Sequence, residues 1–108
     1  LDHALTAIPS VRRPQVQEGV SPALSYYAIR VPAAHRDSIL QAMAVGGVHA
    51  RPYFSLLTGP VTPFAHCEPI TVSSEVIAAR AATELICLPF HSGVTERHVD
   101  AIVTALRG

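Results

Sequence analysis

The feature that most constrains the fold is an uninterrupted apolar run, Leu-Ile-Cys-Leu-Pro, at residues 85–89. The run is too short for a helix, whereas a strand covered on both faces of a sheet carries apolar side chains at successive positions. We therefore predict the central strand of a sheet here. The rest of the chain is expected to supply its neighbours and the helices that cover it.

Two other stretches have the character of strands. Tyr27, Ile29 and Val31 alternate with other residues, and a period of two puts one row of side chains on a core. A second stretch starts at Val48 and ends at Pro52, because proline has no backbone N–H to pair with a neighbouring strand. With the central run, the sequence predicts a sheet of three strands.

Three helices are predicted to pack against this sheet. The first follows Pro32 and ends at a pair of glycines, the second begins at Ser73 or Ser74, and the third begins at Thr95. Apolar residues at helical spacing mark two of them: Ile39, Leu40 and Met43 in the first, and Val99, Ile102, Val103 and Leu106 in the third.

The expected fold class is α/β, close to α+β: a small three-stranded sheet with helices packed mainly on one face. Residues 1–24 are set apart as the end of a connecting helix and a linker, because Pro9 stops a helical pattern and residues 10–24 show no regular period. Residues 25–108 are then expected to form one domain around a single hydrophobic core.

The composition excludes several classes of function. The formal net charge is +0, charged residues make up 15% and hydrophobic residues 49%, so neither disorder nor an electrostatic grip on nucleic acid is expected. No apolar run is long enough to span a bilayer, and nothing resembles a signal peptide. Because the two cysteines form no disulfide framework, we expect a cytoplasmic protein that binds neither nucleic acid nor membrane.

The cysteines and histidines leave two kinds of site to weigh. His66, Cys67, Cys87 and His91 supply four zinc-binding side chains, but their spacing matches no standard structural zinc pattern. Cys87 has apolar neighbours, which keep a thiol protonated and make it a poor nucleophile. The sequence therefore predicts no metal site and no catalytic residue in this chain.

Arg51 is the residue with the strongest claim to a binding role. It stands beside Pro52, Tyr53 and Phe54 at the end of a predicted strand. A guanidinium in that setting recognises a carboxylate or phosphate with two hydrogen bonds, or stacks on an aromatic ring. The other interpretation, a solvated arginine that protects a sheet edge from aggregation, remains open.

Five blocks of sequence, spread over nearly the whole chain, carry a resemblance to a known family. The blocks are Tyr27-Ala-Ile-Arg-Val31, Arg36-Asp37 before Ile39-Leu40, Gly47-Val-His-Ala-Arg-Pro-Tyr-Phe54, Leu85-Ile-Cys-Leu-Pro-Phe90, and Thr95-Glu96 before Val99. In this order they resemble the C-terminal domain of the DegT/DnrJ/StrS family of pyridoxal-phosphate-dependent sugar aminotransferases. The combination is more specific than any single block.

The resemblance implies an enzyme whose large N-terminal domain holds pyridoxal phosphate on a lysine and whose active sites are completed in a homodimer. All eight basic residues of this chain are arginines, so it has no lysine to carry that cofactor. We therefore expect this chain to bind no cofactor and to be inactive alone. Its expected task is to dock on the cofactor domain and complete the substrate cleft of a nucleotide-sugar aminotransferase.

The resemblance assigns the substrate side of the cleft to Arg51, Tyr53 and Thr58. Family members usually carry a histidine where this chain has Thr58, and threonine forms hydrogen bonds but cannot act as an imidazole does. This difference bears on which sugar the parent enzyme accepts. The alternative function is a free-standing ligand-binding or protein-interaction module that has kept the fold of this domain without the catalytic part.

Overall fold

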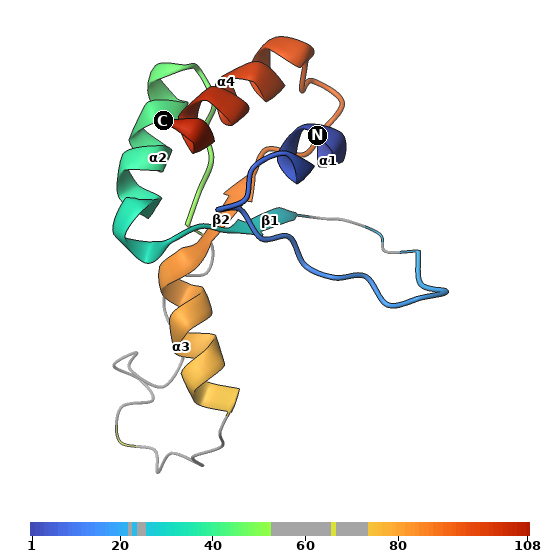
Figure 1. Ribbon diagram of the computed structural model, residues 1–108, viewed down its shortest axis with the longest axis vertical. Helices are drawn as coiled ribbons and strands as arrows, with labels where there is room; N and C mark the ends of the chain where they lie inside the picture. Colours follow the sequence, from blue (N-terminus) through green and yellow to red (C-terminus); the bar gives the residue numbers. More distant parts are fainter. Residues whose placement is uncertain (22, 24–25, 53–65, 67–73) are drawn as a thin grey trace.

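A two-stranded antiparallel sheet lies at the centre of the structure (Figure 1). The structure is a computed structural model that describes residues 1–21, 23, 26–52, 66 and 74–108. Along these residues the elements are α1 (Asp2–Thr6), β1 (Tyr27–Arg30), the 3-10 turn η1 (Ala33–His35), α2 (Arg36–Val45), α3 (Ser74–Glu84), β2 (Leu85–Leu88) and α4 (Glu96–Arg107).

The register of the sheet puts the predicted apolar rows on one face. Tyr27 lies opposite Leu88 and Ile29 lies opposite Ile86, and all four side chains are buried. The period of two predicted for β1 is therefore confirmed. The alternate side chains of β2 are only partly buried, so the expectation of a strand covered on both faces is met on one face only.

The prediction of a third strand starting at Val48 is wrong, because the sheet has two strands in the described part of the chain. Val48 donates its N–H to the Met43 carbonyl at 2.8 Å, so it closes the end of α2 instead. Of residues 48–52, only Arg51 pairs with β2, through hydrogen bonds of 3.0 and 2.7 Å with Cys87. Pro52 follows and has no N–H to extend the pairing, which leaves an isolated bridge.

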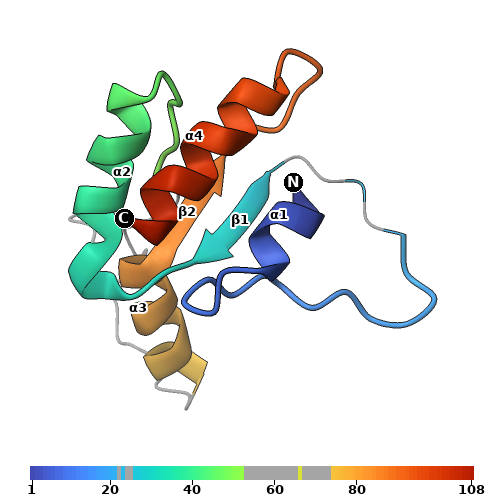
Figure 2. The ribbon, with the colours of Figure 1, turned by 45° about the horizontal axis from the view of Figure 1, so that its top comes forward.

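Helices α1, α2 and α4 cover the buried face of the sheet, whereas α3 projects away from this layer (Figure 1). Figure 2 shows α2 and α4 side by side above the two strands. Burial of their apolar stripes supplies most of the stabilising free energy of a small domain. The buried core consists of Leu5, Ile8, Tyr27, Ile29, Val31, Ile39, Met43, Val48, Ile86, Leu88, Ile102, Ala105 and Leu106.

The predicted stops and starts of the helices are largely confirmed. Helix α2 ends at Gly46, and Gly47 adopts a φ of +82°, a left-handed conformation that an L side chain rarely adopts. Thr95 caps α4, and its N–H donates to Nδ1 of His98 at 3.0 Å. Helix α3 begins at Ser74, but the capping side chains expected at 73 or 74 lie outside the described part of the chain.

The segment before β1 takes part in the fold. Leu5 and Ile8 are buried in the same core as the strands. Farther along, Arg12 and Arg30 exchange backbone hydrogen bonds of 2.9 and 2.8 Å across the free side of β1. The sequence predicted no regular pairing there. Within the described residues, no helix is long and apolar enough to cross a membrane.

Candidate functional site

Arg51 is the predicted binding residue that the structure describes. Its backbone is fixed by the bridge to Cys87, on the side of β2 that faces away from β1, and its side chain is exposed. Tyr53 and Thr58 lie outside the described residues, so their position relative to Arg51 is not defined. The substrate-binding role of the three residues therefore stays a prediction.

The zinc alternative depends on residues that are only partly described. Cys67 lies outside the described part of the chain, and His66 is exposed. Among the residues that are described, no three His, Cys, Asp or Glu side chains gather closely enough to hold a metal ion. Cys87 is half-buried, and its backbone pairs with that of Arg51.

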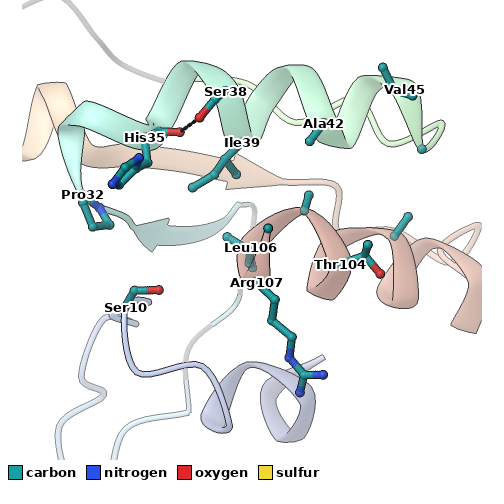
Figure 3. Close-up of a pocket in the computed structure, with 14 residues that line it drawn as sticks. Ser10, Pro32, His35, Ser38, Ile39, Ala42, Val45, Thr104, Leu106 and Arg107 are labelled. Carbon is teal, nitrogen blue, oxygen red and sulfur yellow. Dashed lines mark hydrogen bonds between the residues drawn. The ribbon is translucent and has the colours of Figure 1, made fainter.

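A groove of about 760 Å³ runs between α2 and α4 (Figure 3). In Figure 3, Ile39 of α2 points toward Leu106 of α4. The two helices approach closely at one end, where a Cβ added to Gly46 would lie 3.1 Å from the Cβ of Ala101. The lining is Ser10, Pro32, His35, Ser38, Ile39, Ala42, Val45, Gly46, Ala101, Thr104, Ala105, Leu106, Arg107 and Gly108.

This groove suits an apolar surface better than a reaction. Its lining includes three alanines and the larger aliphatic residues Ile39, Val45 and Leu106, and Val45 is 86% exposed. Among the described residues, no hydrogen bond or ion pair joins the polar side chains of His35 and Arg107, and the Ser38 hydroxyl donates to the His35 carbonyl at 2.8 Å. The groove was not predicted from the sequence, although small residues such as Ala42 and Ala101 are a signal for close helix packing.

A first polar cluster ties α1 to β1. The Tyr27 hydroxyl donates to the Asp2 carboxylate, and Nη1 of Arg13 donates to the same carboxylate at 3.0 Å. The hydrogen bond from Tyr27 is the main cause that lowers the pKa of Asp2, with Arg13 adding to it. Burial is the main cause that raises the pKa of Tyr27, and the hydrogen bond to Asp2 adds to it. The cluster therefore fixes α1 against the sheet.

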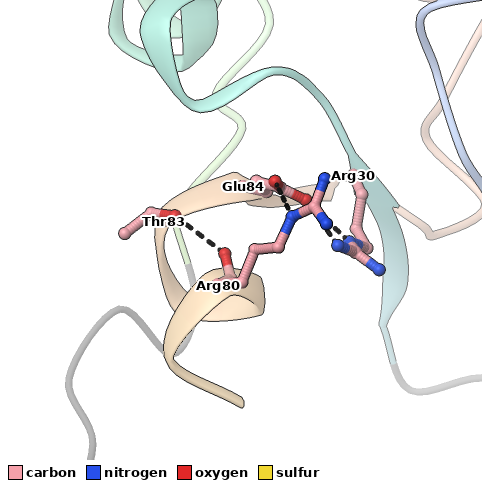
Figure 4. Close-up of polar contacts among 4 residues, drawn as sticks. All are labelled: Arg30, Arg80, Thr83 and Glu84. Carbon is pink, nitrogen blue, oxygen red and sulfur yellow. Dashed lines mark hydrogen bonds and ion pairs between the residues drawn. The ribbon is translucent and has the colours of Figure 1, made fainter. Parts of the chain in front are cut away.

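A second polar cluster joins α3 to β1 (Figure 4). Arg30 donates from Nε at 2.9 Å and from Nη2 at 2.6 Å to Oε2 of Glu84. Arg80 donates from Nε to the other oxygen, Oε1, at 2.8 Å. These hydrogen bonds, first that from Arg80 and then that from Arg30, lower the pKa of Glu84. The i,i+4 spacing of Arg80 and Glu84 was the available sequence signal for half of this cluster.

Each cluster is built on one carboxylate, which a tyrosine hydroxyl and one guanidinium hold in the first cluster and two guanidinium groups hold in the second. Neither cluster pairs a nucleophile with a base. Such arrangements hold elements together or leave positive charge for an anion. Together with the apolar groove, they give the described part of the chain surfaces for contact and binding.

A sequence model of the DegT/DnrJ/EryC1/StrS aminotransferase family matches residues 1–107 of the chain. A search of curated proteins finds no significant match.

Solved structures of aminotransferases share the fold. The aminotransferase TlmJ from Streptoalloteichus hindustanus superimposes with a TM-score of 0.79 at 23% identity, over 98% of this chain and 28% of that one. A DegT DnrJ EryC1 StrS aminotransferase from Brucella abortus gives 0.79 at 20%, over 98% and 27%. The sugar aminotransferase CalS13 from Micromonospora echinospora gives 0.77 at 16%, again over 98% and 27%. The chain thus spans little more than a quarter of these proteins.

Proposed function

The chain belongs to the DegT/DnrJ/EryC1/StrS aminotransferase family, and we propose that it is the C-terminal small domain of a pyridoxal-phosphate-dependent nucleotide-sugar aminotransferase. The observation that supports this proposal is the length of the chain compared with that of the solved aminotransferases. Nearly all of this chain matches the fold of solved aminotransferases, yet it corresponds to only 27–28% of three of them. Residues 1–24 would connect it to the remainder, and residues 25–108 would form the small domain.

The cofactor belongs to another part of such an enzyme. Pyridoxal phosphate supplies the electron sink for transamination when it is bound. This chain contains no lysine, since its eight basic residues are all arginines, so its own residues do not fit a covalently held cofactor. The chain's contribution is then to dock on the cofactor domain and to form one wall of the substrate cleft.

That wall is proposed to include Arg51, Tyr53 and Thr58. Support for Arg51 comes from its place at the edge of β2, where the bridge to Cys87 fixes the backbone while the side chain remains exposed. A guanidinium there suits the negative charge of a sugar nucleotide. Thr58 in place of the family's usual histidine would offer a hydroxyl instead of an imidazole to the substrate.

Docking on a missing domain is supported by the surface of α3. Residues 77–80 of this helix are all exposed, and Ile77 retains 65% of its accessible surface. An exposed apolar side chain on a projecting helix is better stabilised when a second domain covers it. The proposal further includes a homodimeric parent located in the cytoplasm.

The test compares residues 1–108 with the full-length protein that contains them. With pyridoxal phosphate added, the full-length protein should develop the visible absorbance of a lysine-bound cofactor, which borohydride abolishes, and should transfer an amino group to a keto sugar nucleotide. Residues 1–108 should do neither. A borohydride-sensitive band in residues 1–108 alone would overturn the proposal.

Reading the coding sequence upstream of Leu1 separates this function from that of a free-standing module. An open frame that encodes a cofactor domain with its lysine supports the aminotransferase. A start codon immediately before this sequence would instead support a binding module with the same fold.

A further inference from the structure

Three arginines from separate segments line one cavity at the end of the sheet. Arg12 lies in the segment after α1, Arg30 ends β1, and Arg80 lies on α3. The cavity has a volume of about 450 Å³, and Glu84 is also in its wall. Figure 4 shows Arg30 and Arg80 approaching Glu84 from two different elements.

The backbone bridge between Arg12 and Arg30 makes this arrangement specific. The two residues exchange both of their backbone hydrogen bonds, at 2.9 and 2.8 Å, so they lie directly opposite each other. Opposite residues of an antiparallel pair project on the same face, with their Cβ atoms about 5 Å apart. The side chains of Arg12 and Arg30 therefore start from adjacent positions on the same face of the sheet.

The cavity carries an excess of positive charge. Among the described residues of the lining, three are arginines and one, Glu84, is acidic, which leaves a net charge of +2. Both Glu84 oxygens are already occupied by Arg30 and Arg80. In the described part of the chain, the Arg12 side chain forms no hydrogen bond or ion pair, and Arg80 uses only its Nε. Several N–H donors thus remain available at the cavity.

Glu84 also holds two of the arginines in place. The Glu84 side chain is 13% exposed, whereas the side chains of Arg30 and Arg80 are 33% and 72% exposed. Arginines held by a largely buried carboxylate lose less conformational entropy when they bind a ligand than freely rotating ones do. The lowered pKa of Glu84 keeps this carboxylate ionised at neutral pH.

We propose that Arg12, Arg30 and Arg80 form a binding site for a phosphate group, either inorganic phosphate or the phosphate of a larger molecule. A doubly negative oxyanion matches the charge of the cavity, and guanidinium groups bind phosphate oxygens with paired hydrogen bonds. The site is separate from Arg51, because Arg12 flanks β1 whereas Arg51 flanks β2 at the opposite edge of the sheet. It does not depend on the aminotransferase function.

The test is calorimetric titration of the full-length protein with inorganic phosphate, pyrophosphate and UDP, each at the same ionic strength. The variants are Arg12→Gln and Arg80→Gln, with Arg97→Gln as the matched control, since Arg97 is an exposed arginine on α4 away from the cavity. Thermal melting establishes that each variant is folded. Any other phosphate site in the protein contributes equally to all variants.

The expected result is saturable binding that Arg12→Gln weakens about tenfold, the usual loss for one charge-assisted contact, while Arg97→Gln leaves it unchanged. Arg80→Gln should weaken the same binding event. A loss for all three ligands identifies a site for the phosphate group itself, and a loss for UDP alone identifies a nucleotide as its source. If Arg12→Gln and Arg80→Gln both bind every ligand as Arg97→Gln does, the proposal is wrong.

Discussion

Helices α4 and α3 are similar in length but differ in how they are held. Helix α4 lies on the sheet beside α2 and buries Ile102, Ala105 and Leu106. Helix α3 projects from the layer, its residues 77–80 are exposed, and its firm attachments lie at its C-terminal end, where Ala82 and Glu84 meet the body. Helix α4 completes the buried core, whereas α3 presents a surface that the described part of the chain leaves exposed.

The difference in burial shows which elements are stabilised by contacts within the described part of this chain. The layer of α1, α2, α4 and the two strands shares one buried core. The exposed part of α3 gains nothing from that core, so the hydrophobic effect gives it a reason to contact further protein. This is the physical basis for the proposal that α3 faces a cofactor domain.

The largest expected effect comes from removing a core side chain of α4. Ile102 is fully buried, and Ile102→Ala should lower the free energy of unfolding of residues 1–108 by about 2–5 kcal/mol, from lost burial and the cavity it leaves. The matched change Ile77→Ala on α3 should stay within about 0.5 kcal/mol in the same chain. Urea denaturation measures both changes, and equal losses would contradict the difference in burial between α4 and α3.

A smaller loss of stability is expected from a substitution at Gly47, directly after the end of α2. Gly47 has a φ of +82°, so Gly47→Ala should cost about 1 kcal/mol in unfolding free energy from the strained left-handed backbone. Gly47→Asn is the control, because asparagine tolerates this conformation better and should recover part of the loss. The same denaturation experiment reports both, and an unchanged Gly47→Ala variant would refute this account of the helix end.

The smallest effect concerns the attachment of α3 and depends on pH. Hydrogen bonds from Arg80 and Arg30 lower the folded-state pKa of Glu84 below the ordinary value of a glutamate, so this stabilisation is present above that ordinary pKa and is lost as the pH falls through the folded pKa. Glu84→Gln should therefore lose less stability than the wild type between neutral and acidic pH. Glu18→Gln, at an exposed carboxylate before β1, should follow the wild type. Identical pH profiles for all three proteins would contradict the assignment.

Patterns that depend on nearby residues were predictable from the sequence. The alternating residues Tyr27, Ile29 and Val31 are all buried, and so is every second residue of the apolar run at 85–88. The predicted stripe of α4 is buried at Ile102 and Leu106. Each is set by local periodicity and a hydrophobic face. The prediction of a third strand was wrong because the N–H of Val48 donates to the end of α2 and not to a neighbouring strand. Local sequence does not show which of these two acceptors the tertiary structure brings within reach.

Apart from the i,i+4 pair of Arg80 and Glu84, the polar clusters could not be predicted from the sequence, for a related reason. Arg30 and Glu84 are 54 residues apart, and Tyr27 and Asp2 are 25 apart, so nothing local links them. Alanine-rich composition indicated that α3 is a helix but not whether this chain would cover it. Of the predicted substrate wall, only Arg51 falls within the described residues, and the remainder rests on the resemblance to the family.

Hydrogen–deuterium exchange tests whether a further domain covers α3, because it reports the protection of each helix separately. Amide exchange is measured for α3 and α4 in residues 1–108 and in the full-length protein that contains them. The account predicts that α4 is protected in both, since its core is complete, whereas exchange of α3 slows markedly only in the full-length protein. Equal exchange of α3 in the two proteins would show that no further domain docks on it and would contradict the account.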